Sequence, residues 1–341
     1  LSSATVGHPL DGDALADLLA ETQGNPLFVV EVARAHQAAG TAAGARRSPP
    51  LPGAVRESVY GRLDALPAAS VAALGAAVAL ASPATAADPP AVWPARVVAN
   101  YRIAFAGLDI GRFDFTSDVT GKAYKLNASA EMSLLLGAFK WSGSTQSSGD
   151  LSARDPRPAS HALDFKANSK AGSVRLGFAG GKVASMSVVP PNKEHADIVP
   201  LQAKHMADVL DPLTAVLSLS RYDAANPCGR RISIFDGKQR FDLVFSFKRQ
   251  EKVADKKSSG QPDVGYVCRV RYVPIAGYRM NKETRHMTGN DGIEVALRPV
   301  PEANVLVPYR VTVPTIAGSA TLTSHRIEII TQSKKQIALV N

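Results

Sequence analysis

Residues that could act as acids, bases or nucleophiles are scattered along this chain of 341 residues. The seven histidines, among them His161, His195, His205, His286 and His325, fall in different predicted elements. None stands in a His-x-His, His-Glu-x-x-His or Gly-x-Ser-x-Gly pattern, which would indicate a metal site or a serine nucleophile. We therefore predict no catalytic residue, no cofactor and no metal ligand. Most of the histidines are expected to be surface residues or hydrogen-bonded core residues.

Two aspartates and one glycine-rich run come nearest to a chemical site. Asp208 and Asp211 lie three apart in a segment predicted to be helical, a spacing that places them on neighbouring faces. A general acid or base role is one interpretation. Helix capping is favoured, because Pro212 suits the first turn of a helix. The run Gly289-Asn290-Asp291-Gly292 lacks carboxylates at alternating positions, so a turn is favoured over a calcium loop.

The two cysteines, Cys228 and Cys268, are 40 residues apart, and each lies beside a predicted strand. In an oxidising compartment they are expected to form a disulfide, which would contribute roughly 2–4 kcal/mol to stability. Two buried reduced thiols are the alternative. A metal site is disfavoured, because neither a second cysteine pair nor a histidine cluster stands at ligand spacing.

From Val97 onward the chain shows runs that alternate apolar and polar side chains, the pattern of half-buried strands. Gly180-Gly181 and Asp236-Gly237 separate consecutive runs and predict tight hairpin turns. The expected strands are Val97–Phe105, Gly107–Thr116, Leu163–Phe165, Val174–Phe178, Val183–Val189, Ile232–Phe235, Phe241–Phe245, Val264–Val273, Gly292–Arg298, Val305–Val313 and Ala317–Ile330.

One helical segment, Leu201–Ser220, is expected to interrupt these strands. Its apolar residues fall along one face, and Asp211-Pro212 suits the start of a second helix within it. The expected fold class is therefore mainly β. We expect a curled antiparallel sheet, either an open β-barrel or a β-roll, with one helical segment across it and a small all-α fragment before it.

Composition divides the chain near residue 87. The first 87 residues hold 24 alanines, no lysine and two aromatic residues, and residues 1–70 carry a net charge of −2, which leaves +11 for residues 71–341. The apolar run Val71–Leu80 is followed by Ala84 and Ala86, in the small-residue pattern that signal peptidase recognises. A further alanine-rich helix is the alternative. We predict a helical part at 1–67, a signal-peptide-like segment or linker at 68–87, and an exported β domain at 88–341.

Two motifs in the first part of the chain carry a family resemblance, Gly24-Asn25-Pro26-Leu27-Phe28 and Arg62-Leu63-Asp64-Ala65-Leu66-Pro67. Together they make residues 8–67 resemble the end of the ATPase domain of LuxR-type signal-transduction ATPases. The resemblance implies that Pro26 corresponds to a proline that touches the adenine of a nucleotide. The sequence has no Gly-x-x-x-x-Gly-Lys-Ser/Thr loop to hold phosphates, so we expect a truncated remnant without nucleotide hydrolysis.

Four motifs occur in order in the second part: Tyr101-Arg102-Ile103, Asp208-Val209-Leu210-Asp211-Pro212-Leu213, Ile234-Phe235-Asp236-Gly237-Lys238 and, after Cys268, Tyr272-Val273-Pro274-Ile275-Ala276-Gly277-Tyr278. Together they make roughly residues 97–330 resemble an exported proteobacterial family named domain of unknown function 3108. The resemblance implies a periplasmic protein with no assigned reaction.

These patterns lead to a functional hypothesis. We expect a non-enzymatic periplasmic protein that supports the cell envelope and binds a lipid-like ligand, a lipoprotein or a protein partner through the concave face of its sheet. Its basic charge favours anionic lipid head groups or envelope polymers, and neither nucleic acid binding nor a permanent membrane span is expected. An enzyme acting on envelope polymers is one alternative. A cytoplasmic regulatory fusion of the ATPase remnant with a β binding module is the other.

Overall fold

The computed structural model describes residues 93–134, 139–152, 155–192, 195–223, 225–253 and 259–340. The predictions for residues 1–67 and 68–87 fall outside these ranges. The described residues form one antiparallel sheet of fourteen strands with two α-helices and two short 3-10 helices, which confirms the mainly β fold class.

The strands are β1 (Arg96–Phe105), β2 (Leu108–Thr120), β3 (Ala123–Leu134), β4 (Phe139–Leu151), β5 (Pro156–Ala167), β6 (Lys170–Ala179), β7 (Lys182–Val189), β8 (Arg230–Phe235), β9 (Arg240–Lys252), β10 (Val264–Ala276), β11 (Glu294–Val300), β12 (Val305–Thr315), β13 (Gly318–Ile330) and β14 (Gln336–Val340). The helical elements are η2 (Ala203–Met206), α6 (Pro212–Leu219), α7 (Lys282–Thr288) and η3 (Pro301–Ala303).

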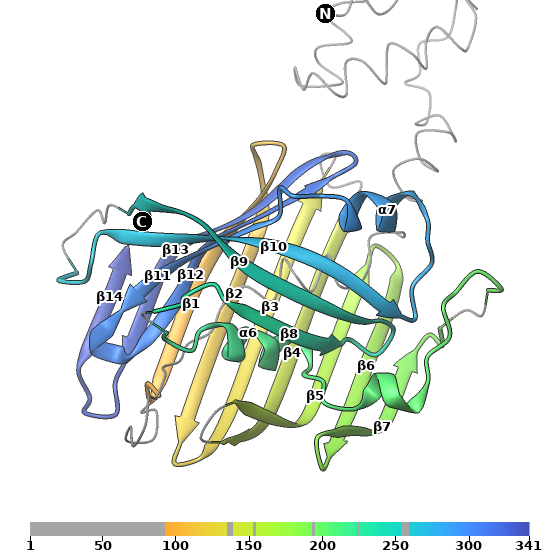
Figure 1. Cartoon of the computed structure of the whole chain (residues 1–341), viewed down its shortest axis with the longest axis horizontal. Helices are drawn as coiled ribbons and strands as arrows, with labels where there is room; N and C mark the ends of the chain where they lie inside the picture. The colour runs from red at the N-terminus through yellow and green to blue at the C-terminus, as the bar shows by residue number, and fades with distance from the viewer. Residues whose placement is uncertain are drawn as a thin grey trace, which may run out of the picture. The chain divides into compact units, whose positions relative to one another are not determined.

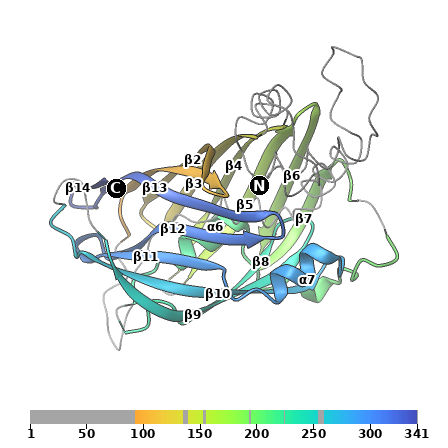
Figure 2. The ribbon, with the colours of Figure 1, turned by 90° about the horizontal axis from the view of Figure 1, so that it is seen from above.

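The sheet consists of two meanders that meet where β1 pairs with β13. The strand order is β7-β6-β5-β4-β3-β2-β1-β13-β12-β11-β10-β9-β8, and β14 also pairs with β13. Figures 1 and 2 show the sheet curled, with β8, β9 and β10 facing the half that contains β4 and β5. Helix α6 lies inside this curl and contacts β4, β5 and β8. The prediction of a curled sheet with a helix across it is therefore confirmed.

Alternation of apolar side chains decides which face of each strand points into the curl. In β1, Val97, Ala99, Tyr101 and Ile103 are all at most 2% exposed, while the residues between them are more exposed. This is the period of two that a strand imposes. Tyr101 also donates a hydrogen bond to the carbonyl of Pro308 in β12 at 2.7 Å, so its hydroxyl is satisfied inside the core.

Both predicted glycine turns are present. Gly180 and Gly181 connect β6 to β7 with φ of +57° and +74°, and Gly237 in the β8–β9 turn has φ of +91°. These values lie in the left-handed region, which glycine occupies without a steric penalty. The turns therefore fix the hairpins at the places that the sequence indicated.

The segment predicted to be helical, Leu201–Ser220, is helical only in η2 and α6. Asp211 is the N-cap of α6, and its Oδ1 accepts hydrogen bonds from the backbone N–H groups of Leu213 and Thr214, both at 3.0 Å. The predicted cap is thus confirmed, whereas the α-helix predicted before it is wrong, because Ala207 and Leu210 form isolated bridges with strands and no α-helical turn lies between them.

The sequence patterns did not predict β3, β4, β14 or α7. Helix α7 contacts β10 and β12, and it is followed by the predicted turn, in which Asn290 Oδ1 accepts a hydrogen bond from the Gly292 N–H at 2.7 Å. Neither helix in the described ranges has the length and apolar character that crossing a membrane requires.

Candidate functional site

A short non-helical segment, Ala207–Leu210, lies between the two edge strands of the sheet. We call it the closing segment. On one side the Asp208 N–H donates to the Gly181 carbonyl in the β6–β7 turn at 2.8 Å. On the other side the Leu210 N–H donates to the Ser233 carbonyl in β8 at 2.9 Å. The closing segment therefore bridges the free edges of β7 and β8, which would otherwise expose unpaired backbone groups.

The geometry of the closing segment separates the two aspartates singled out in the sequence. Asp208 has φ of +52°, a left-handed conformation that aspartate tolerates better than most residues, and it is exposed. Asp211 is fully buried at the start of α6. The prediction that they occupy neighbouring faces of one helix is wrong, because Asp208 belongs to a non-helical segment that is bonded to strand edges.

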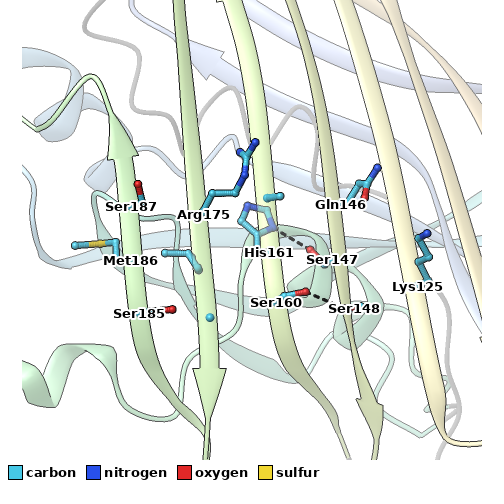
Figure 3. Close-up of a pocket in the computed structure, with 13 residues that line it drawn as sticks. Lys125, Gln146, Ser147, Ser148, Ser160, His161, Arg175, Ser185, Met186 and Ser187 are labelled. Atoms are coloured by element: carbon cyan, nitrogen blue, oxygen red, sulfur yellow. Dashed lines mark hydrogen bonds between the residues drawn. The ribbon is translucent and has the colours of Figure 1, made fainter.

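Asp211 is the centre of a buried polar cluster, the Asp211 cluster, formed with Ser147 of β4 and His161 of β5. Ser147 Oγ donates to Asp211 Oδ1 at 2.6 Å. His161 Nδ1 lies 2.9 Å from Ser147 Oγ and 3.2 Å from Asp211 Oδ1. Figure 3 shows the contact between His161 and Ser147 across neighbouring strands. All three residues are at most 4% exposed, so the cluster ties α6 to the sheet from within.

Electrostatics keep Asp211 ionised inside the core. Burial by itself raises the pKa of this carboxyl, but the charge of His161 and the hydrogen bonds from His161 and Ser147 outweigh it and hold the pKa below its ordinary value. Next to the cluster, the Tyr124 hydroxyl lies 2.9 Å from Thr214 Oγ1 in α6. Burial raises the pKa of Tyr124, so this phenol stays protonated and able to donate.

Serine, histidine and aspartate are also the residue types of a nucleophilic triad, but the arrangement here differs. In a triad the histidine holds the serine with one ring nitrogen and the aspartate with the other. In the Asp211 cluster the same nitrogen, Nδ1 of His161, faces both partners, and Ser147 donates directly to the carboxylate. The geometry therefore favours a hydrogen-bonded anchor for α6 over a nucleophilic centre.

The other histidines considered in the sequence are not brought together. His205 accepts a hydrogen bond from the backbone before η2, and His286 Nε2 lies 3.1 Å from the side-chain amide of Asn290 after α7. His195 precedes η2, and His325 is an exposed residue of β13. In the ranges that the structure describes, no group of three or more His, Cys, Asp and Glu could hold a metal ion.

The structure contains a disulfide between Cys228 and Cys268, whose Cα atoms are 5.4 Å apart and which are both fully buried. Cys228 precedes β8, and Cys268 belongs to β10. Because β9 lies between β8 and β10 in the sheet, the bond ties an edge strand to the second strand inward. Disulfides persist in oxidising compartments, so this bond indicates an extracytoplasmic environment.

The inner face of β3, β4 and β5 carries large apolar side chains that the core does not fully cover. They have the same strand parity as the buried Leu126, Ser147 and His161, so they point into the curl. All of them are half-buried rather than buried. We call this set the inner apolar surface: Met132, Leu134, Phe139, Trp141 and Phe165.

Two rings of the inner apolar surface lie over glycines on the same face of the sheet. A Cβ atom added to Gly143 would be 2.4 Å from Cη2 of Trp141, and one added to Gly172 would be 2.4 Å from Cζ of Phe165. Only glycine leaves room for a ring to lie so close to the backbone. The two glycines therefore allow the rings of Trp141 and Phe165 to lie close to the backbone of the sheet.

Two of the four motifs that carried the second family resemblance, Ile234–Lys238 and Tyr272–Tyr278, meet at the tip of the β8–β9 hairpin. A Cβ atom added to Gly237 would lie 2.5 Å from Cγ1 of Val174 in β6, and one added to Gly277 would lie 2.0 Å from the carbonyl oxygen of Lys238. Tyr272 donates to the side chain of Gln239 at 2.9 Å. These residues pack the tip of the β8–β9 hairpin against β6, close to the place where the closing segment bridges β7 and β8.

Comparison with known proteins gives one family and one structural match. The crystal structure of a beta-barrel-like protein of domain of unknown function DUF1849 from Brucella abortus is similar to this chain with a TM-score of 0.39 and 12% sequence identity, covering 70% of this chain and 98% of that chain. No curated protein matches the sequence. The family described as "Protein of unknown function (DUF3108)" matches residues 100–323.

The family match confirms one of the two resemblances. It begins at residue 100, so the resemblance of residues 8–67 to signal-transduction ATPases stays a prediction. The matched span runs from β1 into β13 and includes the closing segment, the Asp211 cluster and both cysteines. The chain therefore belongs to the DUF3108 family.

Proposed function

We propose that this chain is a non-enzymatic periplasmic protein that supports the cell envelope by binding long acyl chains on its inner apolar surface. The acyl chain belongs either to a phospholipid or to a lipoprotein. The single observation that carries the proposal is a contiguous set of half-buried aromatic, Leu and Met side chains that points into a curled sheet. Apolar side chains left partly uncovered in this way are typical of ligand sites.

Two further observations support this proposal. The Cys228–Cys268 disulfide fits an oxidising compartment. The net charge of +11 on residues 71–341 favours the anionic head groups that envelope lipids carry. The Asp211 cluster stays buried and serves as an anchor, so the proposal assigns it no chemistry.

Binding of an acyl chain should be visible through Trp141. Trp93 and Trp141 are the two tryptophans of the chain, so Trp93→Phe leaves Trp141 as the sole reporter. Addition of oleate is expected to shift the emission of this variant to shorter wavelength, because the indole loses its remaining contact with water. Phe165→Glu in the same background should weaken oleate binding roughly tenfold or more, since it replaces an apolar contact worth about 1.5–3 kcal/mol with a charge.

Ser142→Glu is the matched control, because it adds the same charge to the neighbouring outward-facing position beside Trp141. It should leave oleate binding unchanged. Mass spectrometry of organic extracts of the protein purified from a Gram-negative host then separates a phospholipid from an acylated peptide. The proposal fails if oleate leaves the emission unchanged and the extracts contain no acyl chain.

Export is tested separately from binding. Residues 55–341 produced in a Gram-negative host should be recovered from the periplasm with a new amino terminus at Ala87 or Asp88, because cleavage after Ala86 or Ala87 follows the small-residue pattern. Amino-terminal sequencing of the recovered product gives the answer. An uncut product that remains in the cytoplasm would contradict the predicted signal peptide.

A further inference from the structure

A pocket of about 430 Å³ opens on the face of the sheet opposite the inner apolar surface (Figure 3). Its lining comes from strands β3 to β7. Two cross-strand rows of that lining share one face of the sheet. The first is Lys125, Ser148, Ser160, Gly177 and Ser185, and the second is Gln146, Ala162, Arg175 and Ser187. These positions alternate with the inward-facing row that contains Ser147 and His161, so they lie on the outer face.

Small side chains make the floor of this outer pocket. Ser148, Ser160, Ala162, Gly177 and Ser185 occupy neighbouring strands and rise little above the backbone. The longer side chains of Lys125, Gln146 and Arg175 stand around them (Figure 3). The volume falls within the range of small-molecule sites, about 300–1,000 Å³.

The two cationic side chains of the pocket, Arg175 and Lys125, differ in whether a carboxylate pairs with them. Arg175 is held by the Asp164 carboxylate at 2.7 and 2.8 Å and by the carbonyls of Leu163 and Val174 at 2.9 and 3.0 Å. Its charge is therefore balanced, and its guanidinium forms a fixed wall. Lys125 is exposed and has no hydrogen bond or ion pair within the described part of the chain. The thirteen lining residues include no Asp or Glu, so no lining side chain balances the charge of Lys125, and its cross-strand neighbour Asp118 is bonded by Arg96 at 2.6 Å.

The hydroxyls of the floor retain unused hydrogen-bonding capacity. Ser148 Oγ and Ser160 Oγ lie 2.9 Å apart and bond to each other. A hydroxyl provides one donor and two acceptor positions, so each of them can still bind a further polar group. The Gln146 side chain adds two donors and an acceptor at the wall.

From this arrangement we infer that the outer pocket binds a phosphorylated sugar. The phosphate lies against Nζ of Lys125 at the β3 end, because an ammonium is a compact partner for phosphate. The sugar hydroxyls lie over Ser148 and Ser160, where they exchange hydrogen bonds with the serine hydroxyls and with Gln146. This site is on the opposite face from the inner apolar surface and does not depend on acyl-chain binding.

The test is a titration of the full chain with small-molecule probes. Binding is monitored through the amide chemical shifts in NMR spectra. The probe is glucose 6-phosphate, and glucose and inorganic phosphate are titrated separately. Glucose 6-phosphate should shift the amides of Ser148 and Ser160 and bind more tightly than either half alone. Equal binding of inorganic phosphate would overturn the sugar subsite, and equal binding of glucose would overturn the phosphate subsite. No shift with any probe would overturn the site as a whole.

Variants locate the binding. Lys125→Ala should weaken binding of glucose 6-phosphate about tenfold or more, because it removes a charge-assisted hydrogen bond. Ala162→Phe should abolish binding by filling the centre of the floor. Lys140→Ala removes the same charge from the outer face of β4, outside the pocket, and should leave the affinity unchanged. If Lys140→Ala weakens binding as much as Lys125→Ala, the attraction is a general surface effect and the inferred site is wrong.

Discussion

Replacing Asp211 with alanine is expected to lower the free energy of unfolding by about 3–5 kcal/mol. Loss of the N-cap of α6 accounts for about 1 kcal/mol. The larger part arises because Ser147 and His161 would remain buried without the carboxylate that they contact at 2.6 and 3.2 Å. Removing one partner from a buried pair typically costs about 3–5 kcal/mol. Urea unfolding followed by circular dichroism measures this loss.

Asn281→Ala is the matched control for capping. Asn281 is the N-cap of α7 and accepts a hydrogen bond from the Thr284 N–H at 2.8 Å, but it is half-buried, and no other side chain in the described ranges forms a hydrogen bond with its side chain. Its replacement should cost only about 1 kcal/mol. If Asp211→Ala cost no more than Asn281→Ala, the Asp211 cluster would contribute nothing beyond the cap, contrary to the interpretation given above.

The pH dependence of stability separates two contributions of Asp211, its negative charge and its role as the N-cap of α6. The folded protein holds the pKa of Asp211 below its unfolded value of about 4, so the ionised form stabilises the fold. That contribution is complete above the unfolded pKa and disappears as pH falls through the folded pKa. Asp211→Asn keeps a good N-cap and removes the charge. The stability difference between the native protein and Asp211→Asn should therefore narrow as pH falls below about 4.

Among the strands that the sequence did not predict, β4 shows why a pattern can be missing. In β4 the inward positions that follow Phe139 and Trp141 are Gly143, Thr145 and Ser147, so this part of the strand has no apolar alternation to detect. Gly143 leaves room for the ring of Trp141, and Ser147 donates a hydrogen bond to the buried carboxylate of Asp211 at 2.6 Å. The apolar alternation that would predict a strand is therefore absent from the part of β4 that makes these contacts.

The helix prediction went wrong for a related reason. Met206 and Val209 recur at helical spacing, but the structure places Val209 in the non-helical closing segment, buried in the same apolar cluster as Phe235 of β8. Helical periodicity and burial against two strand edges select the same apolar residues, and local sequence does not distinguish them. The pairing of the closing segment with β7 and β8 decides the conformation, and that pairing depends on the whole sheet.

The Asp211 cluster could not have been predicted from spacing. Ser147, His161 and Asp211 come from three elements, and they meet only because β4 pairs with β5 and α6 crosses both. The one local signal was the Asp211-Pro212 start of a helix, which the sequence did reveal. The two cysteines gave a stronger signal, because their number allows a single intramolecular pairing.

Removing that disulfide is expected to lower the free energy of unfolding by about 3–4 kcal/mol, the chain-entropy value for a loop of this length. The variant that carries both Cys228→Ala and Cys268→Ala tests this in urea unfolding. Reductant should destabilise the native protein by a similar amount and leave the double variant unchanged. Equal stability of the two proteins without reductant would contradict the expectation.

Removing the disulfide should also increase local unfolding near β8 more than in the rest of the sheet. The disulfide ties β8 to β10 across β9, and among the residues that the structure describes β8 pairs on its other side only with the closing segment. Without the bond, β8 is an edge strand whose backbone pairs with β9 along its length and with the closing segment at a single bridge, so amide hydrogen exchange should rise in Arg230–Phe235 and in the closing segment. Exchange in β1 and β2 should change least, because each is paired on both sides. A uniform rise along the sheet would instead show that the bond acts only on the unfolded chain.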